Sequence, residues 1–147
     1  MPVCGKHIRE TSNPEETRRF GEEIGRRLRA GDTVAIYGEL GSGKTCLAGG
    51  IGWGIGVDRK VYMSSPSYTF IKEYDTGRGR VYHVDLYRLE QPAQAYDLPL
   101  EDCIYGEGIT VIEWADRAEQ VLPHDCIRIF IEIVSENERT IEVHPGH

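Results

Sequence analysis

The sequence predicts an α/β fold with a mixed, mainly parallel central sheet and a C-terminal β-hairpin. Helical patterns alternate with short, continuous β-rich runs in the first half of the chain, which is typical of strands buried in a parallel sheet. Paired strand patterns separated by turn residues follow in the second half. The length of 147 residues suits one hydrophobic core, so we expect a single domain over 1–147.

The composition excludes several classes of protein. Hydrophobic residues make up 39% and charged residues 28%, which argues against a disordered chain and against a membrane protein. The first residues are charged where a signal peptide would be apolar, so we expect a cytoplasmic protein. The net charge of −7 makes it a poor candidate for binding nucleic-acid phosphates by itself. The four cysteines, Cys4, Cys46, Cys103 and Cys126, form no Cys-x-x-Cys pair that would indicate zinc or redox chemistry.

The first predicted element is a helix over 14–30. Asn13 suits the N-cap, Pro14 the first helical position, and Gly31 the C-terminal cap. One apolar stripe recurs at every fourth position: Phe20, Ile24 and Leu28. The remaining faces carry arginines that fit either a solvated surface or a docking face: Arg18, Arg19, Arg26, Arg27 and Arg29.

A buried strand over 33–37 follows, and then a glycine-rich turn over 38–43. A second helix should begin at Lys44 with Leu47, Ile51 and Trp53 on its apolar side. Four glycines weaken this helix: Gly49, Gly50, Gly52 and Gly54.

The rest of the chain predicts mainly strands. We expect strands over 61–63, 68–74 and 80–85, with a loop over 64–67 and a turn over 75–79. Short helices should lie within 92–103, and a strand over 109–112 should end at Glu113. Strands over 127–134 and 140–144 should form the C-terminal hairpin, with its turn at 136–138.

The turn after the first buried strand matches the phosphate-binding pattern G-x-x-x-x-G-K-[ST]. Such a loop points backbone amides at a phosphate, while the lysine and the hydroxyl residue serve the phosphate oxygens and Mg²⁺. The predicted strand before it and the predicted helix after it are the context that this chemistry requires. The predicted nucleotide-binding residues are Gly38, Glu39, Leu40, Gly41, Ser42, Gly43, Lys44, Thr45 and Cys46.

Two acidic residues could complete the site. Asp85 and Glu113 each end a buried strand, so each carboxylate should emerge at the rim of the sheet where ligands bind. One would hold Mg²⁺, and the other would hold its waters or orient the attacking water. His83 lies in an apolar strand, where a hydrogen-bonded core histidine is the favoured interpretation over a ligand.

Two further features are candidates for a switch or a partner contact. Ser65, Ser67 and Thr69 belong to a hydroxyl-rich loop that could sense the γ-phosphate, although these residues alone slightly favour an ordinary turn. Trp114 follows Glu113 and, by strand alternation, should point to the opposite face of the sheet, where it could pack in the core or contact a partner.

Taken together, these motifs resemble the TsaE family of P-loop ATPases, which take part in making threonylcarbamoyladenosine in tRNA. The resemblance covers nearly the whole chain. It is carried by Gly-Glu-Leu-Gly-Ser-Gly-Lys-Thr at 38–45, Ser-Pro-Ser-Tyr-Thr at 65–69, His-Val-Asp-Leu-Tyr-Arg-Leu at 83–89 and Ile-Glu-Trp at 112–114.

The resemblance implies a P-loop NTPase-like three-layer fold that binds ATP or ADP with Mg²⁺. It implies that Thr45 and Glu113 hold the Mg²⁺ and that Asp85 is the second acidic residue, required for hydrolysis. With Lys44, these two carboxylates are the expected catalytic residues, and Asp85 is also a candidate metal ligand. Trp114 would serve activity in the complex. The implied partners are TsaD and TsaB, with tRNA reached only through the complex, and with no DNA and no membrane involved.

The alternatives belong to other functional classes. A P-loop small-molecule kinase would need a lid that carries arginines, and the segment between Arg88 and Gly108 has none. A nucleotide sensor that binds without hydrolysis would show the same P-loop. A GTPase is disfavoured because the sequence has no Asn-Lys-x-Asp segment to recognise guanine.

Overall fold

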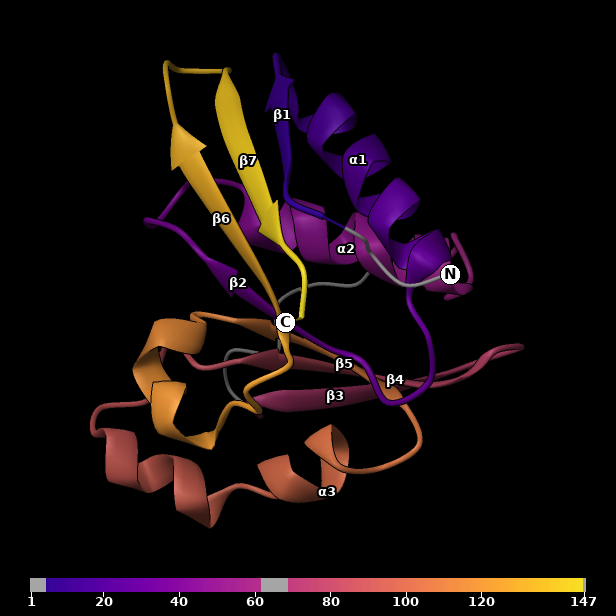
Figure 1. The fold of residues 1–147 in the computed structure, drawn as a ribbon, viewed down its shortest axis with the longest axis vertical. Coiled ribbons are helices and arrows are strands. Elements are labelled where there is room, and N and C mark those ends of the chain that lie inside the picture. Colours follow the sequence, from indigo (N-terminus) through magenta and orange to yellow (C-terminus); the bar gives the residue numbers. More distant parts are fainter. Residues whose placement is uncertain (1–4, 62–68, 147) are drawn as a thin grey trace.

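The fold is built on one mixed sheet, seen in the computed structural model, which describes residues 5–61 and 69–146 (Figure 1). The strands occur in the spatial order β1-β7-β6-β2-β5-β4-β3. Their bounds are β1 His7–Thr11, β2 Thr33–Tyr37, β3 Ile71–Thr76, β4 Gly79–Asp85, β5 Ile109–Glu113, β6 Ile127–Ile133 and β7 Arg139–His144. The helical elements are α1 Pro14–Arg27, α2 Lys44–Ile55, η1 Pro92–Asp97, α3 Leu100–Ile104 and η2 Ala115–Val121.

The centre of the sheet is parallel and both of its edges are antiparallel. Strands β6, β2, β5 and β4 run parallel to one another, whereas β3 pairs antiparallel with β4, and β7 pairs antiparallel with both β6 and β1. The predicted mixed, mainly parallel sheet and its C-terminal hairpin are therefore confirmed. Because the parallel strands share a direction, β2, β4 and β5 all end at the same rim, which is where a ligand site is expected.

Two layers of helices cover the sheet, which gives three layers in all (Figure 1). One face packs against α1 and α2, with a core that includes Phe20, Leu47, Ile51, Val111 and Ile129. The other face packs against η1, α3 and η2, with a second core of Ala35, Leu86, Leu100, Ile112 and other small or branched residues. Alternate residues of each central strand serve opposite cores, as the two-residue period of a strand requires.

The glycines of α1 and α2 allow these two helices to pack with almost no side chain between them. A Cβ atom at Gly50 would lie 2.1 Å from the carbonyl oxygen of Arg18, and one at Gly54 would lie 2.2 Å from that of Glu22. The reverse contacts are equally tight, with a Cβ at Gly25 falling 2.2 Å from the carbonyl oxygen of Ile51. Packing thus explains Gly50 and Gly54, two of the four glycines that lower the helix propensity of α2.

Arg78, in the turn between β3 and β4, joins the C-terminal ends of the same two helices. Its Nη1 donates to the carbonyls of Gly25 at 3.2 Å and Gly54 at 3.4 Å, and its Nη2 donates to the carbonyl of Leu28. The last carbonyls of a helix are not all satisfied by the helix itself, although the Leu28 amide also donates to the Gly25 carbonyl at 3.3 Å. The guanidinium supplies further donors there and interacts favourably with both helix dipoles.

Most predicted elements are present, with some shifts. Asn13 caps α1 by accepting from the Glu16 amide at 2.8 Å, and α2 begins at Lys44. However, α1 ends at Arg27 with Leu28 as its cap, so Gly31, at a φ of 94°, belongs to the following loop. Strand β3 runs over Ile71–Thr76 rather than 68–74, and the turn after it is tighter than predicted.

Strand β1 and helix η2 are additions to the predicted elements. The strand predicted over 61–63 and the loop over 64–67 lie outside the described residues, apart from Val61 and its bend. Among the described residues, no helix has the length and apolar character to cross a membrane.

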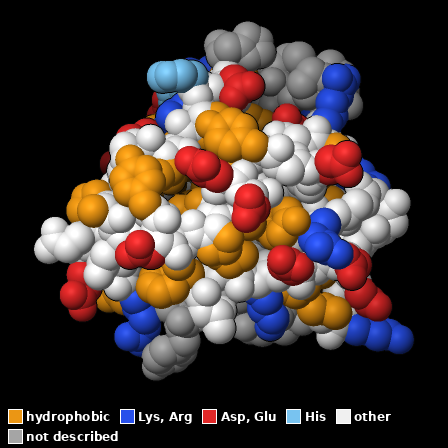
Figure 2. All heavy atoms as spheres, turned by 90° about the horizontal axis from the view of Figure 1, so that it is seen from below, with side chains coloured by type: hydrophobic (Ala, Val, Ile, Leu, Met, Phe, Trp, Pro, Cys, Tyr) orange, Lys and Arg blue, Asp and Glu red, His pale blue; other side chains and the backbone are white. Residues whose placement is uncertain are grey.

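The layer of short helices presents a mixed apolar and acidic surface. Figure 2 views the molecule from the side of η1, α3 and η2, where hydrophobic side chains are interspersed with carboxylates. Tyr96 and Tyr105 are 65% and 69% exposed on this layer. Residues 89–107, which build much of it, carry five carboxylates and no lysine or arginine.

Candidate functional site

The predicted phosphate-binding loop connects the end of β2 to the start of α2. Gly41 and Gly43 have φ angles of 80° and 105°, a left-handed conformation that favours glycine. A Cβ at Gly38 would lie 2.6 Å from the Ser42 hydroxyl, so glycine is needed there for space. The Ser42 hydroxyl is fully buried and has no hydrogen-bond partner among the described residues. The loop therefore folds as a tight glycine-dependent cradle in front of the N-terminus of α2.

Lys44 lies inside this cradle. Its Nζ donates to the carbonyls of Gly38 at 2.6 Å and Glu39 at 2.7 Å, and it lies 3.8 Å from the centroid of the Trp114 ring. Burial lowers the pKa of the Lys44 ammonium, and nearby carboxylates, led by Glu113, oppose that shift. The ammonium is thus held beside the loop by carbonyls and an aromatic face, and it forms no direct ion pair with any residue that the structure describes.

Glu113 is the best-anchored carboxylate of the site. It is 1% exposed, and its two oxygens have different partners. The Thr45 hydroxyl donates to Oε1 at 2.7 Å, and His83 Nε2 lies 2.5 Å from Oε2. His83 is itself fully buried, and within the described residues its Nδ1 has no partner, which favours the tautomer that donates from Nε2. His83 therefore fixes the carboxylate that contacts the P-loop threonine.

Asp85 lies beside Glu113 at the same rim. The two residues are register partners on the parallel strands β4 and β5, and Asp85 is 3% exposed. Asp85 Oδ1 accepts from the Tyr87 amide at 2.9 Å. Burial raises the pKa of the Asp85 carboxyl, and the charge of Glu113 raises it further. Both carboxylates predicted from the strand ends are thus brought together.

Trp114 packs on the face of the sheet that strand alternation predicts. Val111 belongs to the first core, whereas Ile112 belongs to the second core, against which Trp114 also packs. The φ of 58° and ψ of 41° of Trp114 mark the end of the extended strand at Glu113. The Trp114 ring also lies over Lys44 Nζ and 5.0 Å from the Tyr87 ring, centroid to centroid.

A cavity of about 150 Å³ adjoins the loop on the side of the C-terminal hairpin. Its lining combines the start of α1, the loop and the hairpin turn: Asn13, Pro14, Thr17, Gly41, Ser42, Gly43, Cys46, Glu136, Asn137 and Arg139. Cys46 takes part here through its thiol, which donates to the Pro14 carbonyl at 3.1 Å. The guanidinium of Arg139 bonds to backbone carbonyls of the loop and the turn.

The predicted switch loop lies mostly beyond the described part of the chain. Ser65 and Ser67 fall outside the described residues. Thr69 is exposed, and its hydroxyl donates to the Ile71 carbonyl at 3.4 Å. Phe70, next to it, has a φ of 65° and accepts the Asp85 amide at 2.8 Å, so this segment joins the same rim.

The donor set suits Mg²⁺ bound together with a nucleotide. A hydroxyl and carboxylates are the oxygen ligands that Mg²⁺ prefers, and Thr45 and Glu113 are already in contact. Across residues 5–61 and 69–146, no group of three or more His, Cys, Asp or Glu side chains is arranged to hold a metal ion. The Thr45 hydroxyl and the Glu113 carboxylate would hold such an ion together with oxygens of phosphate and water.

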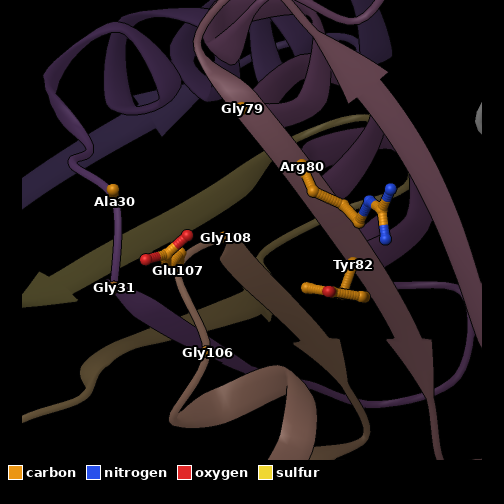
Figure 3. Close-up of a pocket in the computed structure, with 8 residues that line it drawn as sticks. All are labelled: Ala30, Gly31, Gly79, Arg80, Tyr82, Gly106, Glu107 and Gly108. Atoms are coloured by element: carbon orange, nitrogen blue, oxygen red, sulfur yellow. The ribbon is translucent and has the colours of Figure 1, made fainter.

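A larger hollow lies elsewhere in the described surface. It measures about 760 Å³ and is lined by Ala30, Gly31, Gly79, Arg80, Tyr82, Gly106, Glu107 and Gly108 (Figure 3). Gly31 and Gly108 precede β2 and β5, so the hollow lies at the beginning of the parallel strands, whereas the P-loop follows their carboxyl ends. Ligands of open α/β sheets bind at the carboxyl ends, so size alone does not identify the site.

The sequence held a signal for one contact that prediction missed. His83 and Asp85 are two residues apart on one strand, so they share a face, and Glu113 ends the neighbouring strand. The two-residue period of a strand could therefore have predicted that His83 lies close to Glu113. The contacts of Arg139 with the loop had no comparable local signal, because they depend on how the hairpin lies beside the loop.

Comparison with known proteins identifies the family. Residues 11–141 match the family model described as "Threonylcarbamoyl adenosine biosynthesis protein TsaE". The tRNA threonylcarbamoyladenosine biosynthesis protein TsaE of Treponema pallidum is 35% identical over 129 residues, which cover 88% of this chain and 93% of that protein. The protein of the same name from Bacillus subtilis is 37% identical over 131 residues, 89% of this chain and 80% of that protein.

A solved structure agrees with the fold. The crystal structure of Bacillus subtilis YdiB matches with a TM-score of 0.82 and 30% sequence identity, over 99% of this chain and 88% of that one. The family match spans the cradle, both carboxylates and the start of the hairpin that flanks them. The chain belongs to the TsaE family of threonylcarbamoyl adenosine biosynthesis proteins.

Proposed function

We propose that this protein binds Mg–ATP in the loop 38–45 and hydrolyses it to ADP and phosphate. It acts as the ATPase subunit that works with TsaB and TsaD in forming threonylcarbamoyladenosine in tRNA. The observation that carries the proposal is the contact between the P-loop threonine and a buried strand-end carboxylate, Thr45 Oγ1 to Glu113 Oε1 at 2.7 Å. A glycine-rich turn without a ligand has no need of that pairing.

Each residue of the site has a distinct task. The loop amides and the N-terminus of α2 bind the phosphates, and Lys44 neutralises their outer oxygens. Thr45 and Glu113 hold the Mg²⁺, which when bound would offset charge on the β- and γ-phosphates. Asp85 orients the attacking water, which adds to the γ-phosphorus as the bond to the β–γ bridging oxygen breaks. His83 and the Thr45 hydroxyl keep Glu113 in place.

The cavity beside the loop is our proposed position for the base and ribose. It adjoins Gly41 and Gly43 and continues along α1 and the hairpin turn, so a nucleotide with its phosphates in the cradle can reach it. Asn13, Glu136 and Asn137 offer polar groups there that could discriminate one base from another.

The experiment that tests the function compares Lys44→Ala with Lys60→Ala. Lys60 is an exposed lysine at which the change removes the same charge outside the site. We expect Lys44→Ala to abolish ATP binding by calorimetry and ATP turnover by phosphate release, and Lys60→Ala to leave both unchanged. Unchanged ATPase activity in Lys44→Ala would exclude the proposed site.

The role in the complex needs a separate assay. Hydrolysis by the isolated chain should be weak and should rise when TsaB and TsaD are added. Replacing ATP by a non-hydrolysable analogue should stop repeated turnover of the modification reaction. If the analogue supports turnover as well as ATP does, the chain is a nucleotide sensor and not a working ATPase.

A further inference from the structure

Arg139, the first residue of β7, reaches from the C-terminal hairpin to the back of the P-loop. Its Nε donates to the Ser42 carbonyl at 2.8 Å, and its Nη2 donates to the Gly41 carbonyl at 3.2 Å. Its Nη1 donates to three carbonyls of the hairpin turn, those of Ser135 at 2.8 Å, Glu136 at 3.2 Å and Glu138 at 2.9 Å. One side chain thus joins two segments that lie far apart in the sequence.

The two loop contacts determine how consecutive peptides are oriented. In a trans peptide the carbonyl and the next amide point in opposite directions, so fixing the Ser42 carbonyl directs the Gly43 amide away from Arg139. Fixing the Gly41 carbonyl does the same for the Ser42 amide, which donates to the Glu39 carbonyl at 3.0 Å. Loop glycines rotate more freely than other residues, so an external donor has most effect at such positions.

The hydrogen bonds to the hairpin turn hold the Arg139 guanidinium in place beside the P-loop. The carbonyls of Ser135 and Glu138 lie on both sides of the turn, and Glu136 and Asn137 line the same cavity as Gly41 and Gly43. A planar guanidinium presents several donors in fixed directions, which an ammonium cannot reproduce. Arg139 therefore holds the loop and the cavity wall in one arrangement.

We propose that Arg139 is a positioning residue of the nucleotide site, which orients the P-loop peptides for phosphate binding and fixes the hairpin turn beside them. This inference rests on the proposed function, since it concerns the same nucleotide. It predicts that losing the guanidinium weakens nucleotide binding through the loop, beyond any effect on stability.

Arg78 supplies a matched control. It too is an arginine whose guanidinium donates to several main-chain carbonyls, but these lie at the C-terminal ends of α1 and α2. The P-loop precedes the other end of α2, about 18 Å away for a helix of 12 residues. Arg78→Gln and Arg139→Gln each remove a guanidinium that donates to several main-chain carbonyls. Only Arg139→Gln removes hydrogen bonds to the P-loop.

The test measures ADP and Mg–ATP binding by calorimetry, steady-state hydrolysis, and melting temperature for the parent and both glutamine variants. Arg139→Lys is added as a milder change that keeps the charge. We expect Arg139→Gln to weaken nucleotide binding at least about tenfold, since it loses two charge-assisted bonds to the loop, and to raise KM more than it lowers kcat. Arg139→Lys should fall between this variant and the parent. Amide hydrogen exchange in 38–45 should rise in Arg139→Gln and should not rise in Arg78→Gln.

The outcomes separate this inference from the proposed function. Arg78→Gln should lower the melting temperature yet bind nucleotide within about twofold of the parent. If Arg139→Gln binds as the parent does, or if both glutamine variants weaken binding alike, Arg139 has no positioning role. If the parent itself binds no nucleotide, the proposed function fails and this inference falls with it.

Discussion

The carboxylate of Asp85 is needed for the proposed hydrolysis, but its burial lowers the stability of the folded protein when the group is charged. Its folded-state pKa is raised above the usual 3.8 by burial, with a further contribution from Glu113. An acid with a raised pKa binds its proton more tightly in the folded protein than in the unfolded one. Stability linked to this group is therefore fully present below the unfolded pKa and is lost as pH rises through the folded pKa.

Replacing Asp85 by asparagine should remove the loss of folding stability that accompanies ionisation of this side chain. The amide keeps an oxygen to accept the Tyr87 amide and carries no charge. We expect Asp85→Asn to melt a few degrees higher than the parent at pH 7, with chelator present, and the difference to shrink as the pH is lowered toward 3.8. The same variant should lose ATP hydrolysis. A lower melting temperature at pH 7 would show that Asp85 is not strained by burial.

His83 contributes to the site through one hydrogen bond, between its Nε2 and Glu113 Oε2. His83→Phe keeps an aromatic ring in the core but leaves Glu113 Oε2 without the donor that now lies 2.5 Å away. We expect a loss of about 2 kcal/mol in the free energy of unfolding, measured by urea denaturation, because a buried acceptor loses its partner. In Glu113→Ala the same change at position 83 should cost clearly less. Equal losses in the two backgrounds would contradict the coupling.

At the scale of elements, the contact between α1 and α2 reverses an ordinary helix rule. Alanine in place of glycine inside a helix normally stabilises by about 1 kcal/mol. At Gly50 the added methyl would lie 2.1 Å from a backbone carbonyl of α1, which cannot move aside as a flexible side chain could. We therefore expect Gly50→Ala to destabilise the protein by about 2 kcal/mol.

Gly77 provides the comparison for that variant. A Cβ there meets no atom within 4 Å, so Gly77→Ala should change the free energy of unfolding by less than about 0.5 kcal/mol. Thermal or urea denaturation of both variants measures the difference. If Gly50→Ala proves as stable as Gly77→Ala, the helices are not held at the close distance described here.

Elements whose signals are local could be predicted well. The Asn13 cap, the start of α2 at Lys44 and the C-terminal hairpin depend on a few neighbouring residues. Strand β1 could not, because its five residues form a strand only by pairing with β7 from the other end of the chain. Likewise, Gly31 looks like a helix cap in sequence, but the helix ends earlier, at Arg27, with Leu28 as its cap.

The site divides in the same way. The loop and the positions of Asp85 and Glu113 could be predicted, because a motif and two strand ends determine them. The contact of the Trp114 ring with Lys44 could not, because the positive φ of Trp114 is not encoded by strand periodicity. The roles expected of Lys44, Thr45 and the two carboxylates remain predictions that the experiments above address.

For the molecule as a whole, the net charge determines whether the isolated chain can bind tRNA. The net charge of −7 and the segment 89–107, which has no lysine or arginine, disfavour the binding of a polyanion such as tRNA. Arginines such as Arg26 and Arg27 are nevertheless exposed on α1. We expect no measurable tRNA binding by the isolated chain in a gel-shift assay at physiological salt, and binding only when TsaB and TsaD are present. Tight tRNA binding by the chain alone would contradict an indirect role.

The position of the bound nucleotide is tested most directly by a crystal structure with Mg²⁺ and a non-hydrolysable ATP analogue. We predict that the phosphates lie against the amides of 38–45, with the metal at the Thr45 hydroxyl and next to Glu113. Density for the analogue in the hollow beside Arg80 and Glu107, with the P-loop empty, would contradict it.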